Sequence, residues 1–434
     1  MNVNDYIKKT CVIGAGPSGI TVAKNLRQRG LAFDCFEREA DVGGVWNYGT
    51  AASSVYASTH MISSKRMTEF TDFPFPRELP PYPSHQQALA YLRSYAKNFQ
   101  LYDHIQFRTS VERVEPAGEH WQVTLSDGSA PRLYGAVVVA NGHHWDPLLP
   151  TISGEFRGQL LHARDYKTPD ILRDKRVLII GAGNSGCDIA VEAAQHAART
   201  FHSFRRGYYF LPKFLFGRPI DSGGDRLHRW GVPLWLNRQI TSWLVRIALG
   251  KPQTYGLPAP DHRLFETHPI VNSQLPYFVG HGRIAVKPDV TRFCGSQVRF
   301  GDGSEENIDL VICATGYKLS FPFLDARLIR DADSRPNLFL NVFHPRHDNF
   351  FVAGMIQPNS GLWGLADYQA QLIASFLVAQ EQQPRKADWF RRLKSAGAGN
   401  LRGGIRFIDS PRHLLEVEYF GYRRQLQKLL AQFQ

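Results

Sequence analysis

A glycine-rich turn occurs twice in this chain of 434 residues, and the repeat constrains the fold more than any other feature. The first copy reads Thr10-Cys-Val-Ile-Gly14-Ala-Gly16-Pro-Ser18-Gly19, and the second reads Arg176-Val-Leu-Ile-Ile-Gly181-Ala-Gly183-Asn184-Ser185-Gly186. Each copy follows an apolar run of strand character and precedes a helical pattern, the context in which G-x-G-x-x-G binds the phosphates of a dinucleotide. One such turn is weak evidence, but two in the same context predict two nucleotide sites.

Each turn also has a closing strand of its own. The run Val137-Val-Val-Ala140 follows a hairpin at Asp127-Gly128, and Val311-Ile-Cys-Ala314 follows a hairpin at Asp302-Gly303. A repeated set of this kind predicts two complete folding units, and strand and helix patterns continue beyond the second. We therefore predict an α/β fold with two Rossmann-like dinucleotide-binding domains, the second inserted into the first. The predicted ranges are 1–155, 156–316 for the insert, and 317–434 for the return segment with C-terminal helices.

The residues downstream of the two turns differ in charge. Glu37 lies eighteen residues after Gly19, where a carboxylate can accept hydrogen bonds from the ribose hydroxyls of an adenosine. The same spacing after Gly186 reaches a phenylalanine followed by Arg205 and Arg206. Arginine accommodates a 2′-phosphate that a carboxylate would repel. The contrast predicts FAD at the first turn and NADPH at the second, with hydride passing from nicotinamide to flavin.

Further segments are candidates for the flavin site. The run Gly43-Gly44-Val45-Trp46 either brings backbone close to a ligand or forms an ordinary tight turn. Residues 48–83 are rich in proline and aromatic residues, and we expect a loop that packs over a ligand. A buried strand ends at Gly354, and a helix over 367–380 carries Gln369. Such a strand end and helix N-terminus can meet a cofactor ring. Residues 105–113 are expected to form a single strand.

Composition excludes several function classes. The five cysteines are singly spaced, which predicts a reducing, cytoplasmic location, no metal site and no dithiol-using reductase. The net charge is +12, but lysine and arginine appear scattered, so nucleic-acid binding is not expected. We find neither a signal peptide nor an apolar run long enough to span a membrane. The segment 225–248 carries Trp230, Trp235 and Trp243. We expect this segment to pack over its own domain and to form a homodimer contact, in preference to lying on a membrane surface.

The segment before the second turn resembles a known family fingerprint. Phe156, Gly158, His162 and Tyr166 match the F-x-G-x-x-x-H-x-x-x-[Y/F] fingerprint of flavin-containing monooxygenases. Their A-T-G-Y, G-G-x-W and D-F-P-F-P motifs are matched by Ala314–Tyr317, Gly43–Trp46 and Asp72–Pro76, so the likeness spans about residues 11–371. Tyr166 resembles the N- and S-oxygenating group, because relatives that perform Baeyer-Villiger insertion usually carry tryptophan there. We expect the fingerprint residues to couple the two domains.

The resemblance implies a monooxygenase in which reduced FAD reacts with O2 to form a C4a-hydroperoxide. This species would oxygenate an amine nitrogen or a sulfur of a small molecule while NADP⁺ stays bound. One position departs from the family, because Ile62 stands where many members carry asparagine. His60, Ser63 and Ser64 are candidates to replace that amide. The alternatives are an NADPH oxidase, a Baeyer-Villiger-type oxygenase, and a non-catalytic flavoprotein sensor.

Overall fold

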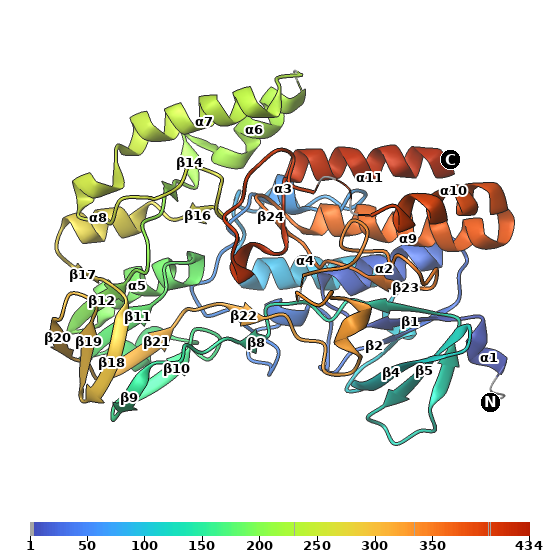
Figure 1. The fold of residues 1–434 in the computed structure, drawn as a ribbon, viewed down its shortest axis with the longest axis horizontal. Helices are drawn as coiled ribbons and strands as arrows, with labels where there is room; N and C mark the ends of the chain where they lie inside the picture. The colour runs from blue at the N-terminus through green and yellow to red at the C-terminus, as the bar shows by residue number, and fades with distance from the viewer. Residues whose placement is uncertain (1–3, 230, 334, 398, 400) are drawn as a thin grey trace. The chain divides into compact units, whose positions relative to one another are not determined.

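Two five-stranded parallel sheets, each built on one glycine turn, organise the computed structural model of the chain (Figure 1). It describes residues 4–229, 231–333, 335–397, 399 and 401–434. Two α/β units result: unit 1 contains Met1–Ser53, Ser63–His143 and Leu319–Gln434, and unit 2 contains Ser54–Ile62 and His144–Lys318. The predicted α/β class with two Rossmann-type units is confirmed.

The sheet of unit 1 has the strand order β23-β7-β1-β2-β3, and its pairings are all parallel. Helices and loops cover both faces of such a sheet, so its central strands are apolar along their whole length. Its strands are β1 (Thr10–Ile13), β2 (Phe33–Phe36), β3 (Ile105–Gln106), β7 (Ala136–Val139) and β23 (Phe350–Val352). The antiparallel strands β4 (Val111–Ala117), β5 (His120–Leu125) and β6 (Arg132–Tyr134) form a second sheet, and β24 (Gln357–Pro358) pairs with β25 (Glu416–Val417).

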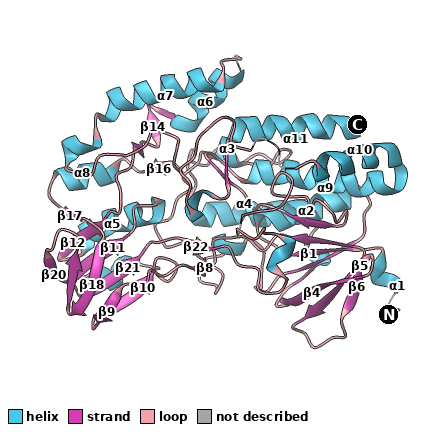
Figure 2. Ribbon diagram, in the orientation of Figure 1, coloured by secondary structure: helices cyan, strands magenta, loops and turns pink. Residues whose placement is uncertain are grey.

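Unit 1 also contains helices of very different lengths, joined by loops (Figure 2). They are α1 (Asn4–Ile7), α2 (Pro17–Gln28), α3 (Lys65–Thr68), α4 (His85–Asn98), α9 (Trp363–Gln382), α10 (Pro384–Ser395) and α11 (Tyr419–Phe433). Short 3-10 turns are η1 (Gly44–Trp46), η2 (Tyr102–His104), η5 (Ala326–Leu328) and η6 (Pro411–His413). Helix α4 begins with a capping box, in which Ser84 accepts a hydrogen bond from the Gln87 amide and the Gln87 side chain accepts one in return.

The sheet of unit 2 has the order β10-β21-β11-β12-β17, also wholly parallel. Its strands are β10 (Gln159–His162), β11 (Arg176–Ile180), β12 (Arg199–Ser203), β17 (Ile284–Lys287) and β21 (Leu310–Cys313). A four-stranded sheet joins β9 (Ser153–Phe156), β18 (Val290–Gly295), β19 (Gln297–Phe300) and β20 (Glu305–Asn307). Two-residue strands are β8 (Asp146–Pro147), β13 (Phe210–Leu211), β14 (Phe214–Leu215), β15 (Arg218–Pro219), β16 (Ile270–Val271) and β22 (Tyr317–Lys318).

The helices of unit 2 are α5 (Asn184–His196), α6 (Ile220–Arg229), α7 (Leu234–Leu249) and α8 (Gln274–Gly280), with 3-10 turns η3 (Pro169–Leu172) and η4 (Pro252–Tyr255). Trp235 and Trp243 lie on α7 with 65% and 64% of their surface exposed, whereas Trp230 lies outside the described residues. Within the described ranges, no helix has the length and apolar character needed to cross a membrane.

The two main sheets repeat the same strand order. They differ in the edge strand beside β7 or β21, which comes after the glycine turn in one unit and before it in the other. The outer strand of unit 1, β23, follows its glycine turn by more than 300 residues, whereas the outer strand of unit 2, β10, precedes its turn. One expectation was wrong: residues 105–113 do not form one strand. Residue Arg108 has φ +54°, and this left-handed residue separates β3 of the parallel sheet from β4 of the antiparallel sheet.

Candidate cofactor sites

The two glycine turns have the same backbone geometry. Gly14 and Gly181, the first glycines, have φ values of +98° and +105°. A Cβ on Gly19 would lie 1.8 Å from the carbonyl oxygen of Gly14, and one on Gly186 would lie 2.0 Å from that of Gly181. These separations are well below van der Waals contact, so only glycine lets each helix begin directly against its turn.

The helix N-termini at these turns fit a pyrophosphate group. Gly16 caps α2 and Gly183 caps α5, both with extended backbone, and no side chain of the described residues caps either helix. A Cβ on Gly16 would meet no atom of the chain closer than 3.6 Å, so the middle glycine leaves room above the turn. Ser18 and Ser185 lie in the first turns. Unpaired amides and the positive end of the helix dipole make such N-termini suitable for anions.

Glu37 lies directly after β2 and is 5% exposed. Its Oε2 accepts a hydrogen bond of 2.6 Å from the amide of Ala15, inside the first turn, and its Oε1 accepts one of 3.0 Å from the amide of Glu39. Burial raises the pKa of this carboxyl, and the two amide hydrogen bonds oppose the rise. Glu37 therefore ties the turn to the strand end, and each oxygen keeps a lone pair that can accept from a ribose hydroxyl.

The paired glycines lie against the first turn. The amide of Gly43 donates to the carbonyl of Ala15 at 3.0 Å, and a Cβ on Gly44 would lie 3.1 Å from the Cα of Gly16. Val45 is half-buried, and the ring of Trp46 packs edge-on against Trp363 at 5.7 Å. The sequence left open a ligand-facing run or an ordinary turn, and the structure places this run next to the first glycine turn.

Gly354 and Gln369 are joined to each other. Gly354 has φ +76°, and a Cβ there would lie 2.0 Å from the Oγ of Ser18. Its amide donates to Gln369 Oε1 at 2.8 Å, and Gln369 Nε2 donates to the hydroxyl of Tyr422 at 2.8 Å. The fully buried Gln369 was expected to contact the cofactor. In the structure the two ends of its amide join the end of β23 to Tyr422 on α11.

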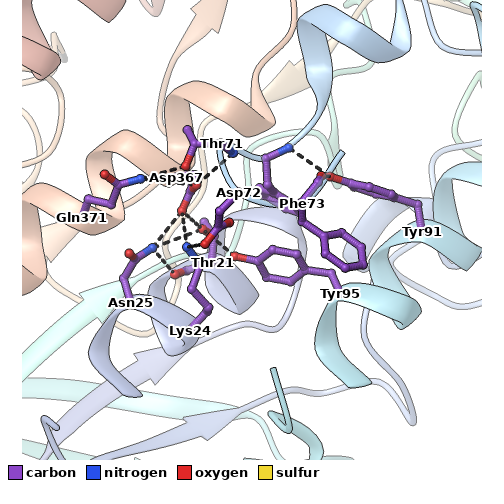
Figure 3. A network of polar contacts seen from close by, with 11 residues as sticks. Thr21, Lys24, Asn25, Thr71, Asp72, Phe73, Tyr91, Tyr95, Asp367 and Gln371 are labelled. Atoms are coloured by element: carbon purple, nitrogen blue, oxygen red, sulfur yellow. Dashed lines mark hydrogen bonds and ion pairs between the residues drawn. The ribbon is translucent and has the colours of Figure 1, made fainter. Parts of the chain in front are cut away.

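A buried carboxylate that sequence reasoning missed stabilises the helix after the first turn (Figure 3). Asp367 on α9 has no exposed surface. It accepts hydrogen bonds from Thr21 Oγ1 at 2.6 Å, from Asn25 Nδ2 at 2.8 Å and from the hydroxyl and amide of Thr71. Lys24 Nζ lies 3.2 Å away. Burial raises the pKa of Asp367, but Lys24 and the hydrogen bonds outweigh burial and hold the pKa below its usual value.

The D-F-P-F-P motif joins the same network. Lys24 Nζ also lies 2.8 Å from Asp72, and the ring of Phe75 stacks on Tyr91 at 3.8 Å. The sequence feature that could have indicated this network is Lys24, a lysine in the helix after the first turn. A lysine that is buried in such a helix requires a partner of opposite charge. The motif thus fixes the position of α2 inside unit 1.

The second turn has a different set of neighbours. Arg205, two residues after the end of β12, is exposed, and Arg206 is half-buried. Asn184 was expected to contact NADPH, but its Oδ1 accepts from the Val271 amide at 2.8 Å and its Nδ2 donates to a backbone carbonyl at 3.0 Å. His202, which sequence reasoning missed, lies 3.0 Å from the carbonyl of Gly181 through Nε2. Burial lowers the pKa of His202 to about 4, so the ring is neutral.

The fingerprint residues organise unit 2. Phe156 packs against Phe293 at 5.3 Å, and a Cβ on Gly158 would lie 2.6 Å from a backbone carbonyl. His162 Nδ1 accepts a hydrogen bond of 3.1 Å from the Arg164 amide, so Nε2 carries the proton that it donates to the carbonyl of Gly316 at 2.9 Å. Burial lowers the pKa of His162, and the hydrogen bond to Gly316 opposes this shift. His162 is a neutral residue that joins β10 to the turn after β21.

Tyr166 ends the fingerprint and is 1% exposed. Its hydroxyl donates to Glu192 Oε2 on α5 at 2.6 Å, and its ring lies 5.6 Å from that of Tyr56. Tyr56 in turn donates to Asp188 on α5 at 3.3 Å. The segment that precedes Ile62 is therefore fixed to the helix of the second turn.

Ile62 and the two serines after it belong to different units. Ile62 packs in unit 2 against a cluster that contains Leu211, Val245 and Val271. Ser63 and Ser64 belong to unit 1, where the backbone carbonyl of Ser64 accepts the first hydrogen bonds of α3.

The fold and these sites define a flavoprotein of the class with two dinucleotide-binding Rossmann units. The family described as "Flavin-binding monooxygenase-like" matches residues 7–431, and the chain belongs to this family. It is 33% identical to mouse flavin-containing monooxygenase 5 over 458 residues, which cover 98% of this chain and 83% of the relative. It is 36% identical to dimethylaniline monooxygenase [N-oxide-forming] 2 of Macaca mulatta over 388 residues, covering 84% and 72%.

Solved structures with the same fold include S-allyl-L-cysteine S-oxygenase from Allium sativum and OTEMO in complex with FAD and NADP. The first has a TM-score of 0.68 at 22% identity over 98% of this chain and 88% of the other. The second has a TM-score of 0.70 at 17% identity over 98% and 97%. The protein is thus a flavin-dependent monooxygenase with FAD and NADPH as cofactors, as the sequence predicted.

Proposed function

We propose that this enzyme transfers one oxygen atom of O2 to the amine nitrogen or the sulfur of a small molecule. Tyr166 carries the proposal, because tyrosine ends the fingerprint where Baeyer-Villiger relatives usually have tryptophan. Its hydroxyl is committed to Glu192 at 2.6 Å, and an indole ring has no hydroxyl to make this contact. The N-oxide-forming activity in the name of the macaque relative supports the same reaction.

In this proposal unit 1 holds FAD and unit 2 holds NADPH. Bound FAD supplies the redox and oxygen-activating chemistry, with NADPH as the source of electrons. The amides at Gly16 would bind the FAD pyrophosphate and Glu37 its ribose, while Glu37 also keeps the turn in place. The amides at Gly183 would bind the NADPH pyrophosphate, and Arg205 and Arg206 its 2′-phosphate. Gln369 and Asp367 would keep the chain segments that form the FAD site in position through their hydrogen bonds.

The test mixes the FAD-loaded enzyme with NADPH, first without oxygen and then in air, with three probes. Dimethylaniline and S-allyl-L-cysteine are the compounds in the names of two similar proteins, and cyclohexanone serves as the ketone probe. An N-oxide or S-oxide is expected. A lactone from the ketone alone would replace the proposal by carbonyl insertion. Flavin reduction with hydrogen peroxide as the only product would replace it by an NADPH oxidase.

The oxidase is the second candidate because of Ile62. Its side chain contributes to an apolar cluster and cannot supply the amide hydrogen bond that many family members provide. Product yield per NADPH oxidised separates the two candidates, since an oxidase forms peroxide in place of product.

Cytoplasmic location and a homodimer complete the proposal. The singly spaced cysteines support the first, and the exposed Trp235 and Trp243 on α7 support a self-contact. Cell fractionation tests the location. Light scattering of the parent protein and of a Trp243→Ser variant tests the homodimer, and a monomeric parent protein would refute the self-contact.

A further inference from the structure

A carboxylate lies beside one of the two arginines assigned to the 2′-phosphate. Arg206 Nε is 3.5 Å from Asp261 Oδ2, and the two side chains are 30% and 53% exposed. Arg205, the neighbouring residue, is exposed. The second site therefore combines two positive charges with one negative charge that the sequence motif does not include.

Local structure holds Asp261 in this position. The chain at Gly207, directly after Arg206, pairs with Pro260 in a β-bridge. A Cβ on Gly207 would lie 2.2 Å from a backbone carbonyl of the facing segment, so glycine is required for this approach. On the other side, His262 Nδ1 lies 2.8 Å from Asp261 Oδ1, and the His262 side chain is 2% exposed. The carboxylate is fixed between a buried imidazole and the arginine.

The charges determine the consequence. A phosphate bound at Arg206 would have to share the guanidinium with Asp261, and it would meet a like charge close by. An adenosine that lacks the 2′-phosphate meets neither effect. We propose that Asp261 is a coenzyme-specificity residue, which opposes the 2′-phosphate through Arg206 and so narrows the preference of the enzyme for NADPH over NADH. This inference rests on the proposed assignment of Arg206 to NADPH.

Calorimetric titration of the FAD-loaded full chain tests the proposal with 2′,5′-ADP and 5′-AMP as probes. In Asp261→Asn, binding of 2′,5′-ADP should tighten about two- to fivefold at low ionic strength, the range of exposed ion pairs, while 5′-AMP is unaffected. Added salt should reduce the gain. The matched control is Asp170→Asn. Asp170 is an exposed carboxylate of unit 2 that pairs with Arg173 at 3.2 Å, and both affinities should stay unchanged.

The Arg206→Ala variant tests whether Asp261 acts on the 2′-phosphate through Arg206. There, Asp261→Asn should no longer alter the affinity for 2′,5′-ADP. An unchanged affinity in the Asp261→Asn single variant, an equal gain for 5′-AMP, or a full gain without Arg206 would each overturn the proposal. If Arg206→Ala binds 2′,5′-ADP as tightly as the parent, the arginine assignment fails and the proposal with it. The oxygenation reaction, which is judged by its products, is not affected by that outcome.

Discussion

Lys24 has two carboxylate partners that differ in burial, and exchanging each for an amide predicts very different losses of stability. Lys24 is 2% exposed and lies 3.2 Å from Asp367, which has no exposed surface, and 2.8 Å from Asp72, which is 39% exposed. The carboxylate accepts five hydrogen bonds from side chains and backbone around it. In Asp367→Asn one amide oxygen must replace it, and the buried ammonium of Lys24 loses a charge partner. Removing one member of a buried pair costs about 3–5 kcal/mol.

Asp72 still faces Lys24 in that variant, so we expect a loss of about 3 kcal/mol, at the lower end of this range. Asp72→Asn removes the shorter but more exposed pair and should cost about 1 kcal/mol or less. For a unit of this size, a loss of 3 kcal/mol lowers the melting temperature by roughly 6–12 °C.

Thermal release of FAD, followed by flavin fluorescence at one fixed FAD concentration, measures both variants, with urea unfolding as a check. Fixed ligand matters because bound FAD raises the apparent stability. Equal shifts for the two variants would refute the argument that burial decides. A loss below about 1 kcal/mol for Asp367→Asn would refute it as well.

Three further predictions concern the turns, the buried histidine and the departing position. Gly19→Ala should yield protein that does not retain FAD, whereas Gly186→Ala should stay yellow but resist bleaching by NADPH, because the added Cβ atoms would lie 1.8 and 2.0 Å from backbone oxygens; spectra of both variants decide. Burial lowers the pKa of His202 to about 4, so the unfolded chain is protonated first, and stability falls as the pH decreases from about 6.5 to about 4. His202→Gln should make that fall shallower by up to about 1.4 kcal/mol per pH unit in urea titrations, and an unchanged slope would contradict the neutral ring. Ile62 is partly buried against the apolar cluster of unit 2, so Ile62→Asn would partly desolvate an amide there and should cost about 2–3 kcal/mol, against about 1 kcal/mol for Ile62→Val. Equal stability of these two variants would show that residue 62 does not pack as described.

The sequence predicted those parts of the fold that depend on local patterns. In each copy of the motif, the apolar strand, the glycines and the residue after the next strand, Glu37 in the first copy, lie within a few dozen residues of each other. The single strand expected over 105–113 is wrong because a left-handed residue, Arg108, interrupts an alternating apolar and polar pattern that looks continuous. Hydrophobic pattern alone does not record such a break.

The site could be predicted less well, because its polar side chains have partners far away in the chain. Asp367 contacts Thr21 across 346 residues, and no periodicity reports such a pair. Gln369 and Asn184 lie close to motifs and are predicted to contact a cofactor, and their side-chain amides also bind distant segments of the chain, which the sequence did not predict. The chain passes from unit 2 to unit 1 between Ile62 and Ser63, and the sequence alone does not predict this boundary.

Isotope labelling tests the central claim most directly. The FAD-loaded enzyme is given NADPH, ¹⁸O2 and dimethylaniline or S-allyl-L-cysteine, and NADPH consumption, peroxide and product are measured together. The account predicts an N-oxide or S-oxide that carries ¹⁸O, formed in proportion to the NADPH oxidised, while the other oxygen atom leaves as water. Complete recovery of the consumed oxygen as labelled hydrogen peroxide, with no labelled product from either substrate, would contradict it.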